Sequence, residues 1–263
     1  MGIADLHVHT RYGDGMATIA ELLAYVEARG GIDVLGVTEH DTLRAGEEAR
    51  EMATRGRYSF DVVCGEEVTT LDGHLLALFI DEPIESFRRI EPTLAAIHRQ
   101  GGLAIVPHPL SWLTRSVGAS VFERVAAAQN DGVYFDAIEE YNASPAGRIS
   151  SARARRLNRE HLGLAAVGSS DAHFLASIGG AYTVFDGRNA ADLRRCIETG
   201  MTIGAEGVRP SLSELGYRNV AVQQWRGMMA TPRNMGWLPT IRSFLVSRGR
   251  AGRGSTPHES DVR

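Results

Sequence analysis

The amino-acid sequence predicts an α/β fold in which strands and helices alternate around a barrel. Apolar runs of strand length alternate with segments of helical period, which is typical of parallel strands joined by helices. Several of these runs stop at histidine, aspartate or glutamate, where barrel enzymes carry their functional groups. A chain of 263 residues, 43% of them hydrophobic, is long enough for one barrel-sized domain with a full core.

The first predicted strand has the most informative pattern. Because side chains alternate along a strand, Asp5, His7 and His9 would share one face. Leu6 and Val8, on the other face, are typical of a buried barrel strand. Two imidazoles two residues apart can bind one metal ion. A polar face inside a hydrophobic element indicates function.

Four further strand-like runs end in the same way. They are residues 34–38 before Glu39, His40 and Asp41, residues 61–65 before Glu66 and Glu67, residues 103–106 before His108, and residues 164–168 before Asp171 and His173. The carboxyl ends of parallel strands meet at one mouth of a barrel. We therefore expect these side chains to converge there.

Helices are predicted between the strands. Thr18 and Glu21 form a capping box at the start of the first helix, which ends at Gly30. Asn189 and Gly200 bracket the last helix in a similar way. The other predicted helices are residues 45–55, 86–100, 121–129 and 149–162, and two more strands are residues 74–80, pairing near the third strand, and 182–185. These elements amount to about seven strand–helix units.

The chain changes character after Pro210. Arginine accumulates and acidic residues are sparse, so residues 1–210 are predicted to form the barrel and residues 211–263 an Arg-rich extension. The extension is predicted to be flexible from about residue 249. We expect it to be dispensable for metal binding, with residues 237–246 either packing on the barrel or meeting an anionic partner.

Few features point to secretion or to a membrane. No basic segment followed by an apolar one precedes the first strand, and no run approaches the roughly 20 apolar residues of a spanning helix.

Cys64 and Cys196 are predicted to be packed thiols. The formal net charge is −4, and all 28 cationic side chains are arginine. A cytoplasmic protein without a membrane span is expected, and its oligomeric state is left open.

The motifs resemble those of the polymerase and histidinol phosphatase (PHP) family, in its branch of metal-dependent phosphoesterases. The matching segments, in the family's order, are His7-Val8-His9-Thr10, Gly13-Asp14-Gly15, Thr38-Glu39-His40-Asp41, Gly65-Glu66-Glu67-Val68, Gly73-His74, His108-Pro109 and Ser170-Asp171-Ala172-His173. The resemblance covers residues 3–210. It implies a distorted (β/α)7 barrel of the PHP type.

The matched motifs contain nine candidate metal ligands. They are His7, His9, Asp14, His40, Glu67, His74, His108, Asp171 and His173. At about three protein ligands per ion, this set fits three divalent ions, Mn2+, Fe2+ or Zn2+. The resemblance assigns His7, His9, Glu67 and Asp171 to the first ion, Asp14, His40 and His173 to the second, and Glu67, His74 and His108 to the third. Glu67 would then bridge two ions.

Other polar residues have expected supporting roles. Adjacent strand residues face opposite sides, so we choose Glu67 as the ligand and expect Glu66 at the rim or behind a ligand. Asp5 and Asp41 are expected to accept a hydrogen bond from a metal-bound imidazole. Three histidines are expected not to bind metal: His98, His161 and His258.

The expected chemistry is attack on phosphorus by a metal-bound hydroxide, because bound metal lowers the pKa of water towards about 7. Asp171 and His173 are the expected catalytic residues, with His173 as a candidate general acid. Arginines that follow strand ends could grip phosphate oxygens in a bidentate way. They are Arg11, Arg44, Arg115 and Arg148.

Three functions are compatible with these residues. They are hydrolysis of a small phosphomonoester such as a nucleotide, phosphodiester cleavage as an exonuclease on short oligonucleotides, and a non-catalytic metal-binding regulatory role. Nucleotide-acting members of this branch often carry a sizeable insert between the Gly-His and His-Pro motifs, whereas only 33 residues separate His74 from His108. The barrel also lacks the strong positive charge of a processive nuclease, so a small phosphomonoester is preferred. Trp112, Trp225 and Trp237 could either pack or stack on a base.

Overall fold

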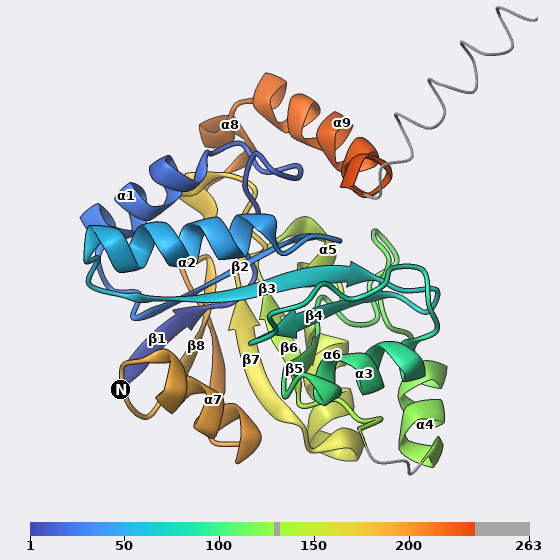
Figure 1. The fold of residues 1–263 in the computed structure, drawn as a ribbon. Helices are drawn as coiled ribbons and strands as arrows, with labels where there is room; N and C mark the ends of the chain where they lie inside the picture. Colours follow the sequence, from blue (N-terminus) through green and yellow to red (C-terminus); the bar gives the residue numbers. More distant parts are fainter. Residues whose placement is uncertain (129–131, 235–263) are drawn as a thin grey trace, which may run out of the picture.

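The computed structural model describes residues 1–128 and 132–234 and shows a nine-stranded sheet that curves into a nearly closed barrel (Figure 1). The strands are β1 (Gly2–Asp5), β2 (Val34–His40), β3 (Asp61–Thr69), β4 (His74–Leu78), β5 (Leu103–Val106), β6 (Ala137–Asn142), β7 (Ala165–Ser169), β8 (Ala181–Phe185) and β9 (Ile203–Glu206). Their order in the sheet is β7-β6-β5-β4-β3-β2-β1-β8-β9. The predicted α/β barrel is confirmed.

Two strands run against the others. β4 is antiparallel to β3 and β5, and β8 is antiparallel to β1 and β9. The pairing of residues 74–80 with the third strand is confirmed, but the expectation of uniformly parallel strands is wrong at β4 and β8. The count of seven strand–helix units is not confirmed, because β4 follows β3 through a short connection without a helix and the sheet has nine strands. β6 and β9 were not predicted at all.

The sheet closes where β7 approaches β8 and β9. Thr183 Oγ1 accepts a hydrogen bond from the Gly168 N–H at 3.1 Å and donates one to the Gly168 carbonyl at 2.9 Å. A Cβ on Gly168 would lie only 2.4 Å from the Tyr182 carbonyl oxygen. A Cβ on Gly204 would lie 2.6 Å from the Val167 carbonyl oxygen. Glycine therefore permits the close backbone approach that joins the two edges.

Helices surround the barrel. They are α1 (Ile19–Arg29), α2 (Arg44–Gly56), α3 (Ile90–Arg99), α4 (Ala119–Ala128), α5 (Pro145–Arg148), α6 (Ser151–Leu157), α7 (Ala190–Glu198), α8 (Leu212–Leu215) and α9 (Tyr217–Asn234). Of these, α8 and α9 lie beside the loop between β1 and α1 (Figure 1). The capping box of Thr18 and Glu21 and the Asn189 cap are observed as predicted.

Two predicted helices differ from the observed ones. The helix expected at residues 86–100 begins only at Ile90, because the Phe87 N–H donates to the Thr69 carbonyl at 2.7 Å and ties the preceding segment to β3. The helix expected at residues 149–162 divides into α6 and a π-helical turn at Asn158–Leu162.

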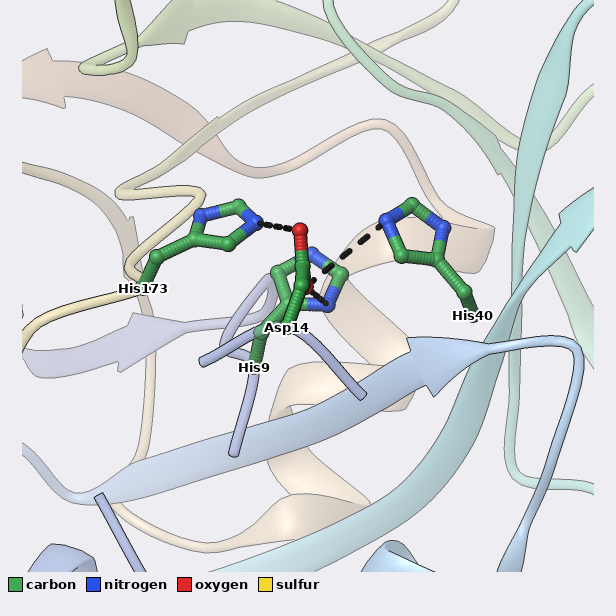
Figure 2. A group of neighbouring side chains, drawn as sticks. All are labelled: His9, Asp14, His40 and His173. Carbon is green, nitrogen blue, oxygen red and sulfur yellow. Dashed lines mark ion pairs between the residues drawn. The ribbon is translucent and has the colours of Figure 1, made fainter. Parts of the chain in front are cut away.

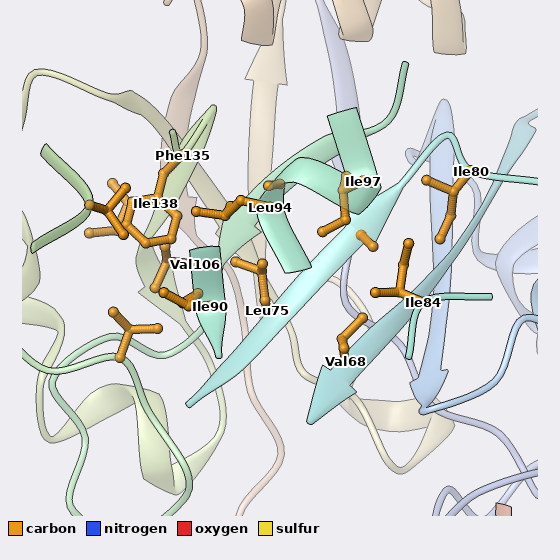
Figure 3. Packing of buried hydrophobic residues seen from close by; sticks show 14 of the residues in the cluster. Val68, Leu75, Ile80, Ile84, Ile90, Leu94, Ile97, Val106, Phe135 and Ile138 are labelled. Carbon is orange, nitrogen blue, oxygen red and sulfur yellow. The ribbon is translucent and has the colours of Figure 1, made fainter. Parts of the chain in front are cut away.

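Apolar side chains fill the barrel and the spaces under the helices. Alternate residues of β4 illustrate the two faces, since Leu76 and Leu78 join the inner cluster and Leu75 and Ala77 the outer one. The inner cluster contains Ala4, Leu6, Val34, Val63, Leu76, Leu78, Leu103, Ile105, Ala137, Ala165, Val167 and Phe185, and it extends to Leu193, Cys196 and Ile197 of α7. Figure 3 shows the outer cluster, which packs α3 and α4 on the sheet. This apolar packing leaves the polar side chains grouped at one mouth of the barrel.

Cys64 and Cys196 are buried free thiols, as predicted. Among the described residues, no helix has the length and apolar character needed to cross a membrane. The segment 237–246 and the tail expected to be flexible lie outside the described residues.

Candidate metal centre

Nine side chains with metal-binding atoms converge at one mouth of the barrel. They are His7 and His9 beyond β1, Asp14 in the loop that follows, His40 on β2, Glu67 on β3, His74 on β4, His108 after β5, and Asp171 and His173 after β7. Because β4 runs against its neighbours, its first residue lies at the same mouth as the last residues of β3. The structure thus brings together all nine candidate ligands.

The segment after β1 is held in an extended form beyond the end of the strand. The His9 N–H donates to the Ala172 carbonyl at 2.9 Å, and the Ala172 N–H donates to the His7 carbonyl at 3.1 Å. On the other side, the Thr38 N–H donates to the Val8 carbonyl at 3.1 Å. Val8 is buried between these neighbours, so His7 and His9 on either side of it point into the mouth.

Glu67 lies at the centre of the histidines. Its Oε1 is 2.7 Å from His74 Nδ1 and 3.0 Å from His108 Nε2. Its Oε2 is 3.0 Å from His40 Nδ1 and 3.4 Å from His7 Nε2. His9 Nε2 also lies 3.5 Å from Oε2. A single carboxylate therefore faces five imidazoles, the position expected of a ligand shared between ions.

Asp14 is the centre of a second grouping, shown in Figure 2. Its Oδ2 lies 3.0 Å from His173 Nε2. Its Oδ1 lies 3.7 Å from His9 Nδ1 and 3.9 Å from His40 Nε2. The ring of His9 stacks on that of His173, with centroids 4.3 Å apart. These four side chains present their ligand atoms within 4.8 Å of one another.

The remaining groupings share residues with these two. They are His7 with His108 and Asp171, His7 with His9 and Glu67, and His40 with Glu67 and His74. The grouping around Asp14 contains the three residues assigned to the second ion. The grouping of His7, His9 and Glu67 lies within the set assigned to the first ion, whereas the other two groupings mix residues assigned to different ions. The assignment of ligands to single ions therefore stays a prediction.

Several buried polar atoms of the cluster have no hydrogen-bond partner among the described residues. They are His7 Nε2, both ring nitrogens of His9, and Asp14 Oδ1. Buried polar groups in proteins are nearly always paired, so unpaired atoms that face one another indicate a bound group. Imidazole nitrogens and carboxylate oxygens are suitable ligands for divalent Mn, Fe or Zn. The residues present therefore fit a metal centre.

Charge in the cluster is set by burial and by opposite charges. Burial favours a raised pKa for the Glu67 carboxyl, but the imidazoles of His74 and His40 hold that pKa well below its usual range. Burial opposes ionisation of Asp171 as well, and His7 holds its pKa well below the usual range. These carboxylates stay ionised, so the mouth of the barrel favours cations.

Glu139 is a site residue that the sequence analysis missed. Its Oε1 lies 3.1 Å from His7 Nδ1, and its Oε2 accepts from the His108 N–H at 2.8 Å and from Asn142 Nδ2 at 2.7 Å. A proton on His7 Nδ1 would leave Nε2 free for a metal. The signal was present, since an apolar pair, Ala137 and Ile138, precedes Glu139 as in the other strand ends.

Asp5 and Asp41 do not have the roles expected of them. Asp5 accepts hydrogen bonds from the backbone N–H groups of Ser170 and Gly179, at 2.9 and 2.8 Å, and burial raises its pKa to about 6. Asp41 accepts from the N–H of Thr69 at 2.7 Å and from the Ser86 hydroxyl at 2.6 Å. Both carboxylates hold loops, and the contact to an imidazole is made by Glu139.

The four arginines expected to bind phosphate are all exposed: Arg11, Arg44, Arg115 and Arg148. Arg11 Nε donates to the Met16 carbonyl at 2.8 Å, and Arg115 lies over the Phe87 ring at 5.5 Å. Their role in phosphate binding stays a prediction.

Other predicted residues lie away from the cluster. Glu66 is buried, with its carboxylate bonded to the Ile84 N–H, and burial raises its pKa to about 8, so it is not at the rim. His98 pairs with Asp136 at 2.9 Å, and His161 is exposed. His258 lies outside the described residues.

Comparison with known proteins bears on the family and the fold of this chain. A family model described as PHP-associated matches residues 149–202. An uncharacterized protein of Methanocaldococcus jannaschii is 32% identical over 151 residues, covering 53% of this chain and 81% of that protein. A two-domain protein of Bacteroides vulgatus, containing a predicted PHP-like metal-dependent phosphoesterase, has the same fold with a TM-score of 0.61 and 19% identity. That match covers 78% of this chain and 64% of the other. The chain belongs to the PHP family.

Two relatives with named activities match a shorter part. The 5'-3' exoribonuclease Rnm of Salmonella typhimurium is 34% identical over 83 residues, covering 30% of this chain and 28% of that protein. Phosphoribosyl 1,2-cyclic phosphate 1,2-diphosphodiesterase of Eggerthella lenta is 36% identical over 86 residues, covering 30% of this chain and 32% of that protein. The chain therefore aligns with about a third of each enzyme.

Proposed function

We propose that this chain is a metal-dependent phosphoesterase that hydrolyses a small phosphomonoester. The observation that carries the proposal is the cluster of six imidazoles and three carboxylates with buried, unpaired ligand atoms. The two relatives with named activities, an exoribonuclease and a cyclic phosphate diphosphodiesterase, support phosphoester cleavage as the reaction class.

The nine ligands are assigned to three divalent ions, Mn2+, Fe2+ or Zn2+, with Glu67 shared. When bound, such ions supply Lewis acidity for the phosphoryl oxygens and a water of lowered pKa. The protein itself fixes the ligands: Glu139 orients His7 and the backbone of His108, and Ala172 holds the segment carrying His7 and His9.

His173 is the protein's candidate for proton transfer to the leaving oxygen, a role that requires its Nε2 to be free of the second ion, because Nδ1 is held by the Asp171 carbonyl. Its side chain is 17% exposed, whereas those of His7 and His9 are fully buried, so a substrate can reach it. The backbone carbonyl of Asp171 lies 3.0 Å from His173 Nδ1 and orients the ring. A general acid must come within hydrogen-bond reach of the leaving group, and this exposure is compatible with that role.

The surroundings favour a substrate with a small organic group. Trp112 is 78% exposed and lies four residues after His108, so its ring is available to a base or a sugar. Trp225 is also exposed, but it lies on α9 and is two residues from Gln223, which places it on a different side of that helix. The short connection between β4 and β5 leaves little chain for a domain that would track a nucleic-acid strand.

The alternative is phosphodiester cleavage of short oligonucleotides, which the similarity to Rnm supports. Protein reconstituted with Mn2+ should be tested for phosphate release from nucleoside monophosphates, nucleoside bisphosphates and sugar phosphates, and for digestion of labelled oligonucleotides. We expect the highest kcat/KM for a phosphomonoester. A kcat/KM for oligonucleotides about tenfold above that of every monoester would favour the exonuclease.

A further inference from the structure

Helix α9 reaches back to the candidate metal centre. The side-chain amide of Gln223 donates a hydrogen bond to Asp14 Oδ2 at 3.1 Å, and Gln223 is only 7% exposed. In Figure 1, α9 lies beside the loop that leads from β1 to α1. A polar side chain from the C-terminal segment is thus buried against a candidate ligand.

Asp14 depends on support from outside its own segment. The other candidate ligands lie on strands or within a few residues of one, whereas Asp14 lies in the loop before α1. This loop is held by few backbone bonds, among them Gly13 N–H to the Thr10 carbonyl at 3.2 Å and Met16 N–H to the His173 carbonyl at 2.8 Å. The Asp14 carboxylate is contacted by His173 Nε2, 3.0 Å from Oδ2, and accepts a hydrogen bond from the Gln223 amide at the same oxygen.

Two more residues of α9 fit the same contact. Arg226 Nη2 donates to the Arg11 carbonyl at 3.0 Å, which ties the helix to the loop of Asp14. Gly227 lies one turn after Gln223, and a Cβ there would sit 2.9 Å from Asp14 Oδ2. Glycine is unfavourable inside a helix, so its presence at this close approach indicates that α9 is fitted to Asp14.

We propose that Gln223 is a positioning residue for metal binding: its amide holds Asp14 Oδ2 so that Oδ1 faces His9 and His40. The inference rests on the proposed metal centre. It makes α9 part of that centre and replaces the expectation that residues after Pro210 are dispensable for metal binding.

The test compares full-length Gln223→Met with Gln224→Met. Methionine keeps the length and helix propensity of glutamine but removes the donor. Gln224 is a matched control, because it is exposed and its amide donates to Gln223 rather than to Asp14. Free Mn2+ is measured by electron paramagnetic resonance during titration of metal-free protein. We expect one class of sites in Gln223→Met to bind about tenfold more weakly, as for other residues that orient ligands, with the remaining sites unchanged.

Gly227→Ala provides a second variant that adds a methyl group instead of removing a donor. Alanine favours the helix, so circular dichroism of the metal-free protein should show no loss of helix, while the same class of Mn2+ sites should weaken. Unchanged Mn2+ binding in both variants, or an equal loss in Gln224→Met, would overturn the proposal. Weakened binding in a protein that hydrolyses no phosphoester would uphold the role of Gln223 and refute the proposed function instead.

Discussion

At the scale of single residues, the Glu67 carboxylate lies close to several imidazoles, whereas a simple ion pair has one partner. Replacing it with glutamine removes the charge that several cations share, so we expect activity and metal affinity to fall at least 10- to 100-fold. Metal content and phosphate release would be measured side by side. Glu66→Gln is the control, because Glu66 is buried away from the cluster and its pKa of about 8 leaves it largely uncharged near neutral pH. Equal activity of the two variants would contradict a central role for Glu67.

Glu139 offers a second test at this scale. Its carboxylate lies within hydrogen-bond distance of His7 Nδ1, the His108 N–H and the Asn142 side-chain amide. A glutamine in its place would direct its own NH2 group, which is a donor, at one of these donors. We expect Glu139→Gln to weaken metal binding by about 10- to 100-fold. Glu140→Gln is the matched control, since Glu140 accepts from Asn158 instead. Calorimetry would measure the metal affinity of both variants. Similar affinities would show that His7 needs no carboxylate partner for its ring.

At the scale of elements, His98 fastens α3 to the segment before β6. Its ring nitrogens lie 2.8 Å from the Gly132 carbonyl and 2.9 Å from Asp136. Burial favours a lower pKa for His98, but the hydrogen bond to Asp136 outweighs it, and the pKa is raised. The folded state thus binds this proton more tightly than the unfolded state. The stabilisation is complete below the unfolded pKa of about 6.5 and is lost as pH rises through the folded value.

His98→Gln should therefore reduce the free energy of unfolding by about 1–2 kcal/mol at pH 5.5 and by less at pH 9. Urea unfolding of the variant and the parent protein at both pH values measures the difference. His161→Gln, at an exposed histidine, should show no such trend. A pH-independent loss in His98→Gln would mean that packing on Tyr134 matters more than the charge.

At the scale of the whole molecule, closure of the barrel depends on backbone contact at Gly168. Alanine there would place a methyl group 2.4 Å from the Tyr182 carbonyl oxygen, so β7 and β8 would have to separate. We expect Gly168→Ala to cost about 1–3 kcal/mol in urea unfolding of the metal-free protein. Gly118→Ala is the control, because a Cβ at Gly118 meets no atom within 4 Å. A stability equal to that of the control would show that the edges tolerate separation.

Local patterns made several features predictable. The caps at Thr18 and Asn189 follow from side chains that bond backbone groups three residues away. Candidate ligands such as His7 and His40 were found because each lies within or just beyond a recognisable apolar strand. Burial of the matching apolar face fixes such strands, and the alternation of side chains then directs the polar face.

Other features depend on contacts between distant parts of the chain. The sequence by itself determined the α/β class, the polar motifs at the strand ends and the identity of the candidate ligands. Only the tertiary structure decided that β4 and β8 run against their neighbours, that Glu139 rather than Asp5 contacts a histidine ring, and that Gln223 reaches Asp14. Strand direction and such pairings depend on which surfaces pack together, and these surfaces come from segments far apart in the sequence. The local periodicity of a segment does not indicate its distant partner.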